Sequence, residues 1–347
     1  MLNFCTLFNT NYLARGLALY ESLEKNCTAF HLYVYAFDDA SYDCLKKLNY
    51  PHLTPVAMKE WEDEAILAVK PTRSMAEYCW TSTATILRYS ITHYKLESCT
   101  YLDADLYFYS NPQVLFDEIA GNSVAISSHR YTPIYDQSVT SGIYCVQFMF
   151  FRNDERGMRV LNWWRDRCIE WCFARYEDGK FGDQKYLDNW PSQFEGVHVF
   201  KHRGEGLAPW NIQQSRPGLE NGKLTITEIS SGKKWNAIYF HFHGVKFFTD
   251  QQVALCGSLY EFSNEQVALF YFPYLKRLLE IEADLKEKGF ILNSNGATQP
   301  APGKMAILVQ FLKERLLNIK MGKASPFHFK MYNFSRHNHY YSLNQIR

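Results

Sequence analysis

Strand and helix patterns alternate over the first sixty residues, and this alternation constrains the fold more than any other feature. Residues 2–8, 30–37 and 53–57 are short apolar runs of the kind that buried strands show. The first two runs are each followed by apolar residues at helical spacing, and Asp38-Asp39 could cap the second helix. This order predicts the βαβαβ half of a doubly wound α/β sheet, which binds ligands at the carboxyl ends of its strands.

The first strand lacks the usual signature of dinucleotide binding. No G-x-G-x-x-G pattern follows residues 2–8. A dehydrogenase is therefore disfavoured, and a nucleotide held by loops and a metal ion is favoured.

Two aspartates, Asp103 and Asp105, interrupt the apolar and aromatic stretch of residues 99–109. The run before them is typical of a strand buried on both faces, so both carboxylates would lie at its carboxyl end. They share a face of an extended chain, and a bend at Ala104 would let both reach one cation. Hard oxygen ligands suit Mg²⁺ or Mn²⁺ bound together with substrate phosphates. The alternative is a strand end that carries two solvated acids.

The rest of the first 250 residues continues the α/β pattern. Helices are expected at residues 75–94, 114–119 and 154–175, and strands at residues 123–127 and 143–151. The helix at 75–94 carries Arg88, whose guanidinium matches phosphate or carboxylate if it faces a ligand and is otherwise solvated.

Composition describes a globular protein and excludes few functions. The 347 residues are 47% hydrophobic and 21% charged, enough for one large domain or two ordinary ones. A net charge of +1 gives no argument for nucleic acid as a partner. The nine cysteines form no C-x-x-C pair, which favours reduced thiols in the cytosol. We expect a cytoplasmic protein, since neither a signal peptide nor an apolar run of membrane-spanning length is evident.

Four motifs occur in a fixed order along residues 2–250, with Arg88 ahead of the second. They are Phe4-Cys5-Thr6-Leu7-Phe8-Asn9-Thr10-Asn11-Tyr12-Leu13, Tyr101-Leu102-Asp103-Ala104-Asp105, Gly182-Asp183-Gln184 and His241-Phe242-His243-Gly244-Val245-Lys246. In combination they resemble nucleotide-sugar-dependent glycosyltransferases of the GT-A fold, closest to the family-8-like enzymes related to glycogenin and to bacterial lipopolysaccharide galactosyltransferases.

The resemblance implies a Rossmann-like mixed sheet flanked by helices, and it assigns roles to residues. The metal, Mn²⁺ or Mg²⁺, would be held by Asp103, Asp105 and His241, with His243 as the less favoured histidine. Asp183 would position the donor sugar, and Gln184 would stabilise an oxocarbenium-like centre, unless Asp183 only caps a helix. The donor-binding set comprises Thr6, Leu7, Phe8, Tyr12, Arg88, Asp103, Ala104, Asp105, Gln147, Gly244 and Lys246. Retention of anomeric configuration is also implied.

Two positions depart from the family pattern. Lys246 follows Gly244 by two residues, whereas the family usually has three. Cys145-Val146-Gln147 replaces an Asn-Ala-Gly-like turn that lines the sugar pocket, so Gln147 adds bulk where a glycine is common. Trp210, in a loop after Gly204 and Gly206, could either floor the sugar site or anchor the loop to the core.

Residues 251–347 have a different character and are expected to form a helical extension to a catalytic domain of residues 1–250. Residues 255–288 are expected to be helical, and residues 293–303 form a linker rich in Gly, Asn and Pro. A basic amphipathic helix would follow and could lie on an anionic membrane or fold back onto the protein. Its apolar stripe is Met305, Leu308, Val309, Leu312, Leu316 and Ile319; its cations are Lys304, Lys313, Arg315, Lys320 and Lys323; the aromatics Phe327, Phe329, Tyr332 and Phe334 come after it.

The function expected from the resemblance is transfer of a sugar from a UDP-linked donor to a glycan or lipid-linked acceptor in polysaccharide or lipopolysaccharide synthesis. The protein would work in the cytoplasm or at the inner face of the membrane. Two alternatives stay open: a sugar-1-phosphate nucleotidyltransferase, whose Gly-rich basic loop is missing here, and a non-catalytic protein that binds nucleotide sugars.

Overall fold

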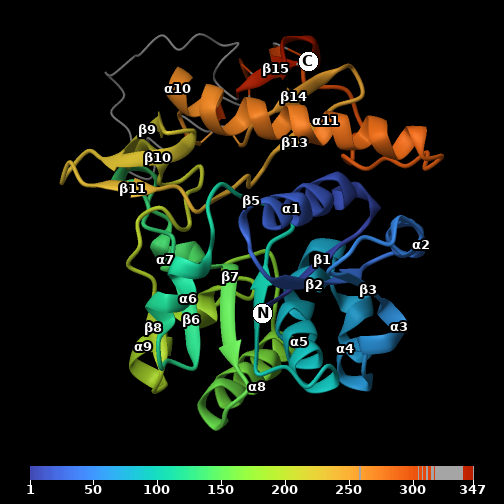
Figure 1. The fold of residues 1–347 in the computed structure, drawn as a ribbon, viewed down its shortest axis with the longest axis vertical. Coiled ribbons are helices and arrows are strands. Elements are labelled where there is room, and N and C mark those ends of the chain that lie inside the picture. The colour runs from blue at the N-terminus through green and yellow to red at the C-terminus, as the bar shows by residue number, and fades with distance from the viewer. Residues whose placement is uncertain are drawn as a thin grey trace.

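The structure is a computed structural model that describes residues 1–257, 259–303, 305, 306, 308, 309, 312, 313, 316 and 339–346. Within these residues a seven-stranded sheet has the order β3-β2-β1-β4-β7-β6-β8 (Figure 1). Its strands are β1 Leu2–Phe8, β2 Phe30–Ala36, β3 Leu53–Ala57, β4 Ser98–Leu102, β6 Val124–Ser128, β7 Tyr144–Arg152 and β8 Val197–Val199. The first four are parallel, and β7 runs antiparallel to β4 and β6. The predicted α/β class with a mixed sheet is confirmed.

Each face of the sheet is covered by helices, because the strands are apolar on both sides. In β1, Phe4 and Phe8 belong to one apolar core, and Cys5 and Leu7 belong to the other. This alternation follows from the two-residue repeat of an extended chain. The two cores place the sheet between two layers of helices, as Figure 1 shows.

The helices of the two layers come from different parts of the chain. The core of Phe4 includes residues of α1 (Leu13–Asn26) and α11 (Phe272–Glu287), and the core of Cys5 includes residues of α5 (Met75–His93) and α8 (Glu155–Glu170). The shorter helices are α2 Asp39–Leu48, α3 Met58–Trp61, α4 Glu64–Val69, α6 Gln113–Ile119, α7 Ser138–Ser141, α9 Trp190–Gln193 and α10 Asn264–Gln266.

Two helix predictions need correction. The helix predicted at residues 154–175 is capped by Asp154 but ends at Glu170, and Trp171 is extended. Phe173, just beyond it, packs under the guanidinium of Arg73 at 3.9 Å, a cation–π contact outside the helix. The helix predicted at residues 255–288 starts only after Ser263, whose capping box sets its first turn.

The described residues between Ala254 and Ser263 form no helix, and the strand just before them pairs with residues 340–342. Strand β14 (Gln252–Ala254) lies between β13 (Lys246–Phe247) and β15 (Tyr340–Ser342). The segment predicted as a linker at residues 293–303 is partly packed: Ser294 and Asn295 are buried, and the Ser294 carbonyl accepts from the N–H of Ala14 at the start of α1. The division into domains at residue 250 stays a prediction.

The predicted basic amphipathic segment lies largely outside the described residues, including Lys304, Arg315, Ile319, Lys320, Lys323 and the aromatics that follow. Its proposed place on a membrane therefore stays a prediction. In the part of the chain that the structure describes, no helix is both long enough and apolar enough to cross a bilayer.

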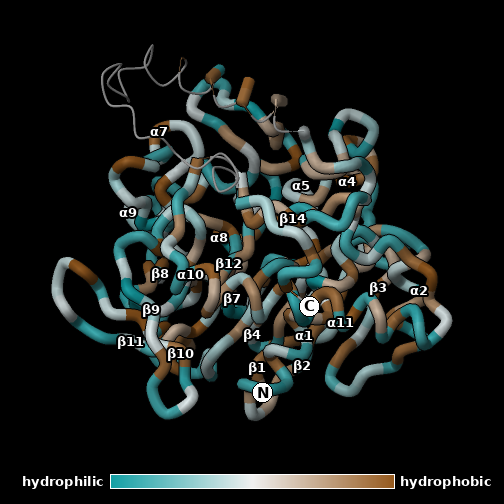
Figure 2. Tube along the Cα trace, turned by 90° about the horizontal axis from the view of Figure 1, so that it is seen from above, coloured by the Kyte–Doolittle hydropathy of each residue, from teal (hydrophilic) through white to brown (hydrophobic). Residues whose placement is uncertain are grey.

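One part of the fold was not predicted. Strands β9 (Ser215–Glu220), β10 (Lys223–Glu228) and β11 (Lys234–Asn236) form an antiparallel sheet of their own. It lies at the margin of the molecule, on the opposite side from α2, in both views (Figures 1 and 2).

Candidate metal and nucleotide-sugar site

Asp103 and Asp105 lie in a turn between β4 and the short strand β5 (Leu106–Phe108), so the predicted bend at Ala104 is present. β5 pairs antiparallel with β12 (Tyr239–His241), and this register places His241 opposite Leu106. Two backbone hydrogen bonds fix the turn: the N–H of Asp103 donates to the carbonyl of Gln147, and the Asp105 carbonyl accepts from residue 242, both at 3.0 Å. The fold thus brings position 241 next to position 105.

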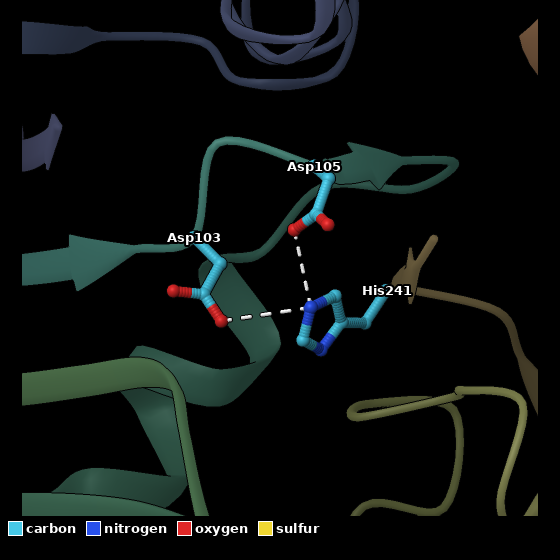
Figure 3. Close-up of side chains that lie close together, drawn as sticks. All are labelled: Asp103, Asp105 and His241. Carbon is cyan, nitrogen blue, oxygen red and sulfur yellow. Dashed lines mark ion pairs between the residues drawn. The ribbon is translucent and has the colours of Figure 1, made fainter. Parts of the chain in front are cut away.

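The three predicted metal ligands converge on one point. Nε2 of His241 lies 3.1 Å from Oδ1 of Asp105 and 3.6 Å from Oδ2 of Asp103, and the side chains point toward one another (Figure 3). One ligand atom from each residue lies within 4.8 Å of the others. His243, the alternative ligand, lies beside the group at an exposed position, with its ring centroid 5.6 Å from that of His241.

The ligand atoms are oriented by neighbours. The hydroxyl of Tyr101 donates to Oδ1 of Asp103 at 2.9 Å, which leaves Oδ2 facing His241. Nδ1 of His241 lies 2.9 Å from the amide oxygen of Gln147. Two carboxylates and an imidazole nitrogen, held in this way, fit a divalent cation such as Mg²⁺ or Mn²⁺.

The electrostatics of the group favour a positive charge at its centre. Burial opposes ionisation of Asp105, but the neighbouring His241 outweighs burial and lowers the pKa of Asp105 to about 2. Burial raises the pKa of Asp103, and the negative charge of Asp105 raises it further. His241 lowers it only in part, so the pKa is about 6. Burial also disfavours a charged His241, yet the two carboxylates, Asp105 first, raise its pKa well above the usual value. A cation at this point would replace the proton that His241 holds.

The three residues lie in the wall of a cavity of about 700 Å³. The cavity opens at the carboxyl ends of β1 and β4, where the strand order reverses and where α/β sheets bind ligands. Its lining comprises Leu7, Phe8, Asn9, Tyr12, Met75, Ala76, Cys79, Trp80, Thr83, Tyr101, Asp103, Ala104, Asp105, His129, Tyr131, Gln137, Ser141, Cys145, Val146, Phe181, Gly182, Asp183, Gln184, Trp210, His241, His243 and Tyr260.

Of the predicted donor-binding residues in β1 and the loop after it, Leu7, Phe8 and Tyr12 line the cavity and Thr6 is buried behind them. Tyr12 is 40% exposed, and the guanidinium of Arg15 lies 4.4 Å from the centroid of its ring. Such an exposed aromatic face, backed by a cation, is suited to stacking on a planar ligand.

The two predicted catalytic residues also line the cavity. Asp183 is buried, and burial together with the charge of Asp103 raises the pKa of Asp183 well above its ordinary value. The amide nitrogen of Gln184 donates to the carbonyl of Ser141 at 2.6 Å, which fixes the orientation of the amide. The 3₁₀ turn that follows, Lys185–Asn189, has Gln184 as its N-cap and no side-chain capping bond, so Asp183 is not its cap residue.

Besides Thr6, four predicted donor-binding residues are not among those that line the cavity in the described structure. Arg88 lies on α5, Gln147 is fully buried behind His241, Gly244 packs near Cys256, and Lys246 is exposed on β13. Their contact with a donor stays a prediction.

Several lining residues were not predicted from the sequence. Trp80 and Thr83 lie one turn apart on α5 and share its cavity-facing side, a signal that helical spacing could have given. His129, Tyr131 and Tyr260 had no such signal, because only the tertiary fold brings them to the cavity wall. Trp210 lines the cavity and also packs in a buried cluster with Cys145 and Tyr260, and its contact with a sugar stays a prediction.

Arg15 was also missed, and it ties three segments together beside the cavity. It is buried in α1, and its guanidinium donates to the carbonyls of Asn11, Val245 and Asn295 at 3.2, 2.9 and 3.5 Å. These bonds join the loop after β1 to the turn that precedes Lys246.

Comparison with known proteins gives both structural and sequence relatives, although no family model matches the chain. Among solved structures, the galactosyltransferase LgtC in complex with donor and acceptor sugar analogs is 14% identical, with a TM-score of 0.41 over 60% of this chain and 75% of that one. Mouse xyloside xylosyltransferase 1 is 14% identical, with a TM-score of 0.40 over 60% of this chain and 87% of that one. The glycosyltransferase GlyE of Streptococcus pneumoniae TIGR4 is 12% identical, with a TM-score of 0.46 over 83% of this chain and 64% of that one.

Two proteins of Bacillus subtilis strain 168 are similar in sequence. The uncharacterized protein YfnF is 29% identical over 258 residues, which cover 72% of this chain and 84% of YfnF. The uncharacterized protein YfnD is 31% identical over 284 residues, which cover 80% of this chain and 88% of YfnD. At this identity and coverage, the chain belongs to the same protein family as YfnD.

Proposed function

We propose that the chain is a glycosyltransferase that moves a sugar from a nucleoside-diphosphate donor, UDP-linked, to a glycan or lipid-linked acceptor with the help of Mn²⁺ or Mg²⁺. One observation carries the proposal. Asp103, Asp105 and His241 converge within a large cavity at the carboxyl ends of β1 and β4. That is where an α/β sheet binds a nucleotide, and a triad of this kind takes a cation that also binds phosphates.

The chemistry of transfer matches the residues of the cavity. Cleavage of the anomeric bond builds negative charge on the diphosphate leaving group. A divalent cation held by the triad supplies Lewis-acid stabilisation of that charge, an effect worth several kcal/mol. Tyr12 offers its exposed face to the base, next to the positive charge of Arg15.

On the sugar side, we assign Asp183 to binding of the donor hydroxyls and Gln184 to the anomeric centre. Because the amide nitrogen of Gln184 donates to Ser141, its carbonyl oxygen is the end of the amide that is available to a developing positive charge. A carboxamide is a poor nucleophile, so a covalent intermediate on Gln184 is disfavoured. We propose that the acceptor hydroxyl attacks on the leaving-group side and passes its proton to a donor phosphate oxygen, which retains the anomeric configuration.

A donor screen tests this function. Purified protein is incubated with UDP-, GDP-, CDP- and TDP-sugars, with and without Mn²⁺, and release of free sugar and nucleotide is measured. We expect slow hydrolysis of one donor that requires the metal and stops on chelation. Binding of nucleotide without turnover of any donor, with or without candidate acceptors, would instead indicate a non-catalytic protein. Release of diphosphate from a nucleoside triphosphate and a sugar 1-phosphate would indicate a nucleotidyltransferase.

A further inference from the structure

We propose that Gln147 is a positioning residue of the metal triad. Its amide oxygen accepts the Nδ1–H of His241 and thereby presents Nε2 of His241 to the cation. This inference rests on the proposed metal site, and it gives Gln147 a role other than the donor contact that the sequence predicts.

The position of Gln147 links it to two of the three ligands. It lies on β7, its exposed fraction is 0%, and its side chain is outside the cavity lining. Its Oε1 is 2.9 Å from Nδ1 of His241, and its main-chain carbonyl accepts the N–H of Asp103 at 3.0 Å. One residue therefore orients the side chain of one ligand and the backbone of another.

The bond to Nδ1 determines which nitrogen of His241 is free for a cation. Nε2 faces the carboxylates of Asp103 and Asp105, so it can only donate a proton to them or bind a cation between them. If the amide N–H of Gln147 faced Nδ1, the neutral ring would carry its proton on Nε2 and block that place. With the amide oxygen there, the proton stays on Nδ1, as in the outer shells of metal-binding histidines.

The pocket around the amide favours this role. A Cβ on Gly206 would lie 2.9 Å from Nε2 of Gln147, so the side chain fits because residue 206 is a glycine, which also has a φ of +58°. Among the described residues, Nε2 of Gln147 has no hydrogen-bond partner. In the described part of the chain, the side-chain amide of Gln147 therefore has its hydrogen bond with His241. Burying an amide without a hydrogen bond costs free energy.

The test compares two substitutions in the full chain and measures Mn²⁺ affinity directly, by electron paramagnetic resonance without donor. Gln147→Met keeps the volume and removes the acceptor; Gln147→Glu keeps an acceptor at the same place. We expect Gln147→Met to weaken Mn²⁺ binding by roughly 10- to 100-fold, as loss of outer-shell partners does, and Gln147→Glu to bind at least as tightly as the wild type. Gln193→Met, at an exposed position, is the matched control and should bind normally.

The outcomes separate this inference from the function on which it rests. Normal affinity of a folded Gln147→Met variant would overturn the inference while leaving the metal site intact. A wild-type protein that binds no Mn²⁺, with or without UDP, would overturn both. Absence of donor hydrolysis would count against the transferase alone, since the affinity comparison needs no turnover.

A measurement on the wild type covers the case in which Gln147→Met fails to fold. The ring nitrogens of His241 are followed in ¹⁵N NMR spectra of the Mg²⁺- and UDP-loaded protein, with the signals assigned by their loss in His241→Gln. We expect the proton on Nδ1. A proton on Nε2, with Nδ1 bare, would overturn the inference.

Discussion

Replacing Asp105 by Asn removes one negative charge from the triad and almost no volume. Asp105 makes the shorter of the two contacts with Nε2 of His241, and its pKa is lowered to about 2, so its carboxylate is ionised at neutral pH. Because Lewis-acid stabilisation is worth several kcal/mol and about 1.4 kcal/mol is tenfold in rate, we expect Asp105→Asn to lower transfer at least about a hundredfold. Steady-state rates over a range of Mn²⁺ concentrations measure this.

The control for this substitution is Asp117→Asn on α6, where the carboxylate is exposed. It should leave the rate unchanged. Circular dichroism should show that both variants are folded. Full activity of Asp105→Asn in the presence of a chelator would remove the metal from the mechanism.

Asp183→Asn separates a role in donor binding from a role in stability. Burial raises the pKa of Asp183, so the folded protein binds a proton more tightly there than the unfolded chain does. Asp183 therefore lowers the free energy of unfolding of the wild type progressively as the pH rises from 3.8, the pKa in the unfolded chain, toward the pKa in the folded protein. The variant lacks this titration, so we expect its melting temperature to equal or exceed that of the wild type at pH 8, while kcat falls severely.

Melting curves at pH 5 and pH 8, together with kcat at pH 8, distinguish a role of Asp183 in donor binding from a role in stability. If Asp183→Asn melted lower than the wild type at pH 8 and turned over normally, the carboxylate would be structural and the assignment to the donor sugar would be wrong.

At single positions, the sequence predicted the three candidate metal ligands but not the contact between His241 and Gln147. Asp103 and Asp105 could be predicted because two charges after an apolar run are unusual in a buried strand. His241 came from a motif, and the structure separates it from His243. The sequence showed Gln147 only as a large side chain at a position where glycine is common. Its hydrogen bond to His241 could not be predicted, because the two residues are 94 positions apart.

At the scale of elements, Asp38 joins the loop after β1 to the start of α2. Its carboxylate accepts from the N–H of Thr10 at 2.8 Å and from the N–H of Ser41 at 2.7 Å. Burial opposes ionisation, but the bonds from Thr10 and Ser41 outweigh it and lower the pKa of Asp38 below its usual 3.8. The stability that Asp38 contributes is therefore complete above about pH 4 and is lost as the pH falls through the lowered pKa.

We expect Asp38→Ala to cost roughly 1 kcal/mol at pH 7, the usual worth of an N-cap, with less difference from the wild type at pH 2. Asp39→Ala, one residue further and exposed, is the control. Urea denaturation at both pH values measures the free energies of unfolding. An equal cost at pH 2 and pH 7 would show that the ionised carboxylate is not what stabilises α2.

Helices and strands could be predicted where burial imposes a regular spacing of apolar residues on the sequence. β1, β2 and β3 follow from their apolar runs, and α5 follows from its helical pattern without the capping box at Ser74. Strands β9 and β11 are mostly exposed or half-buried and lack that spacing, whereas Leu224 and Ile226 of β10 are buried in the core of Phe4. A signal was nevertheless present: Asn221-Gly222, both with positive φ, form the two-residue turn between β9 and β10, and Asn-Gly is a strong hairpin signal.

At the scale of the whole molecule, the C-terminal residues return to the cavity wall. β15 pairs with β14, and the His339 ring lies 3.0 Å from the carbonyl of Tyr260, which lines the cavity. The sequence could not predict this, because β15 is only three residues long and its partner strand lies some ninety residues earlier. Residues 339–346 are thus part of the fold.

The packing of residues 339–346 on the core can be tested at two adjacent positions. Leu343 is buried in the same core as Phe4 and donates its N–H to the carbonyl of Gln251, whereas the side chain of Asn344 is exposed. Because Leu343→Ala removes buried apolar volume, we expect it to lower the free energy of unfolding by about 2–5 kcal/mol, and Asn344→Ala to change it by less than about 0.5 kcal/mol. Denaturant titration of both variants measures the difference. Equal stability of the two would mean that residues 339–346 do not pack on the core in solution, and the contact between His339 and Tyr260 would then no longer support the cavity wall.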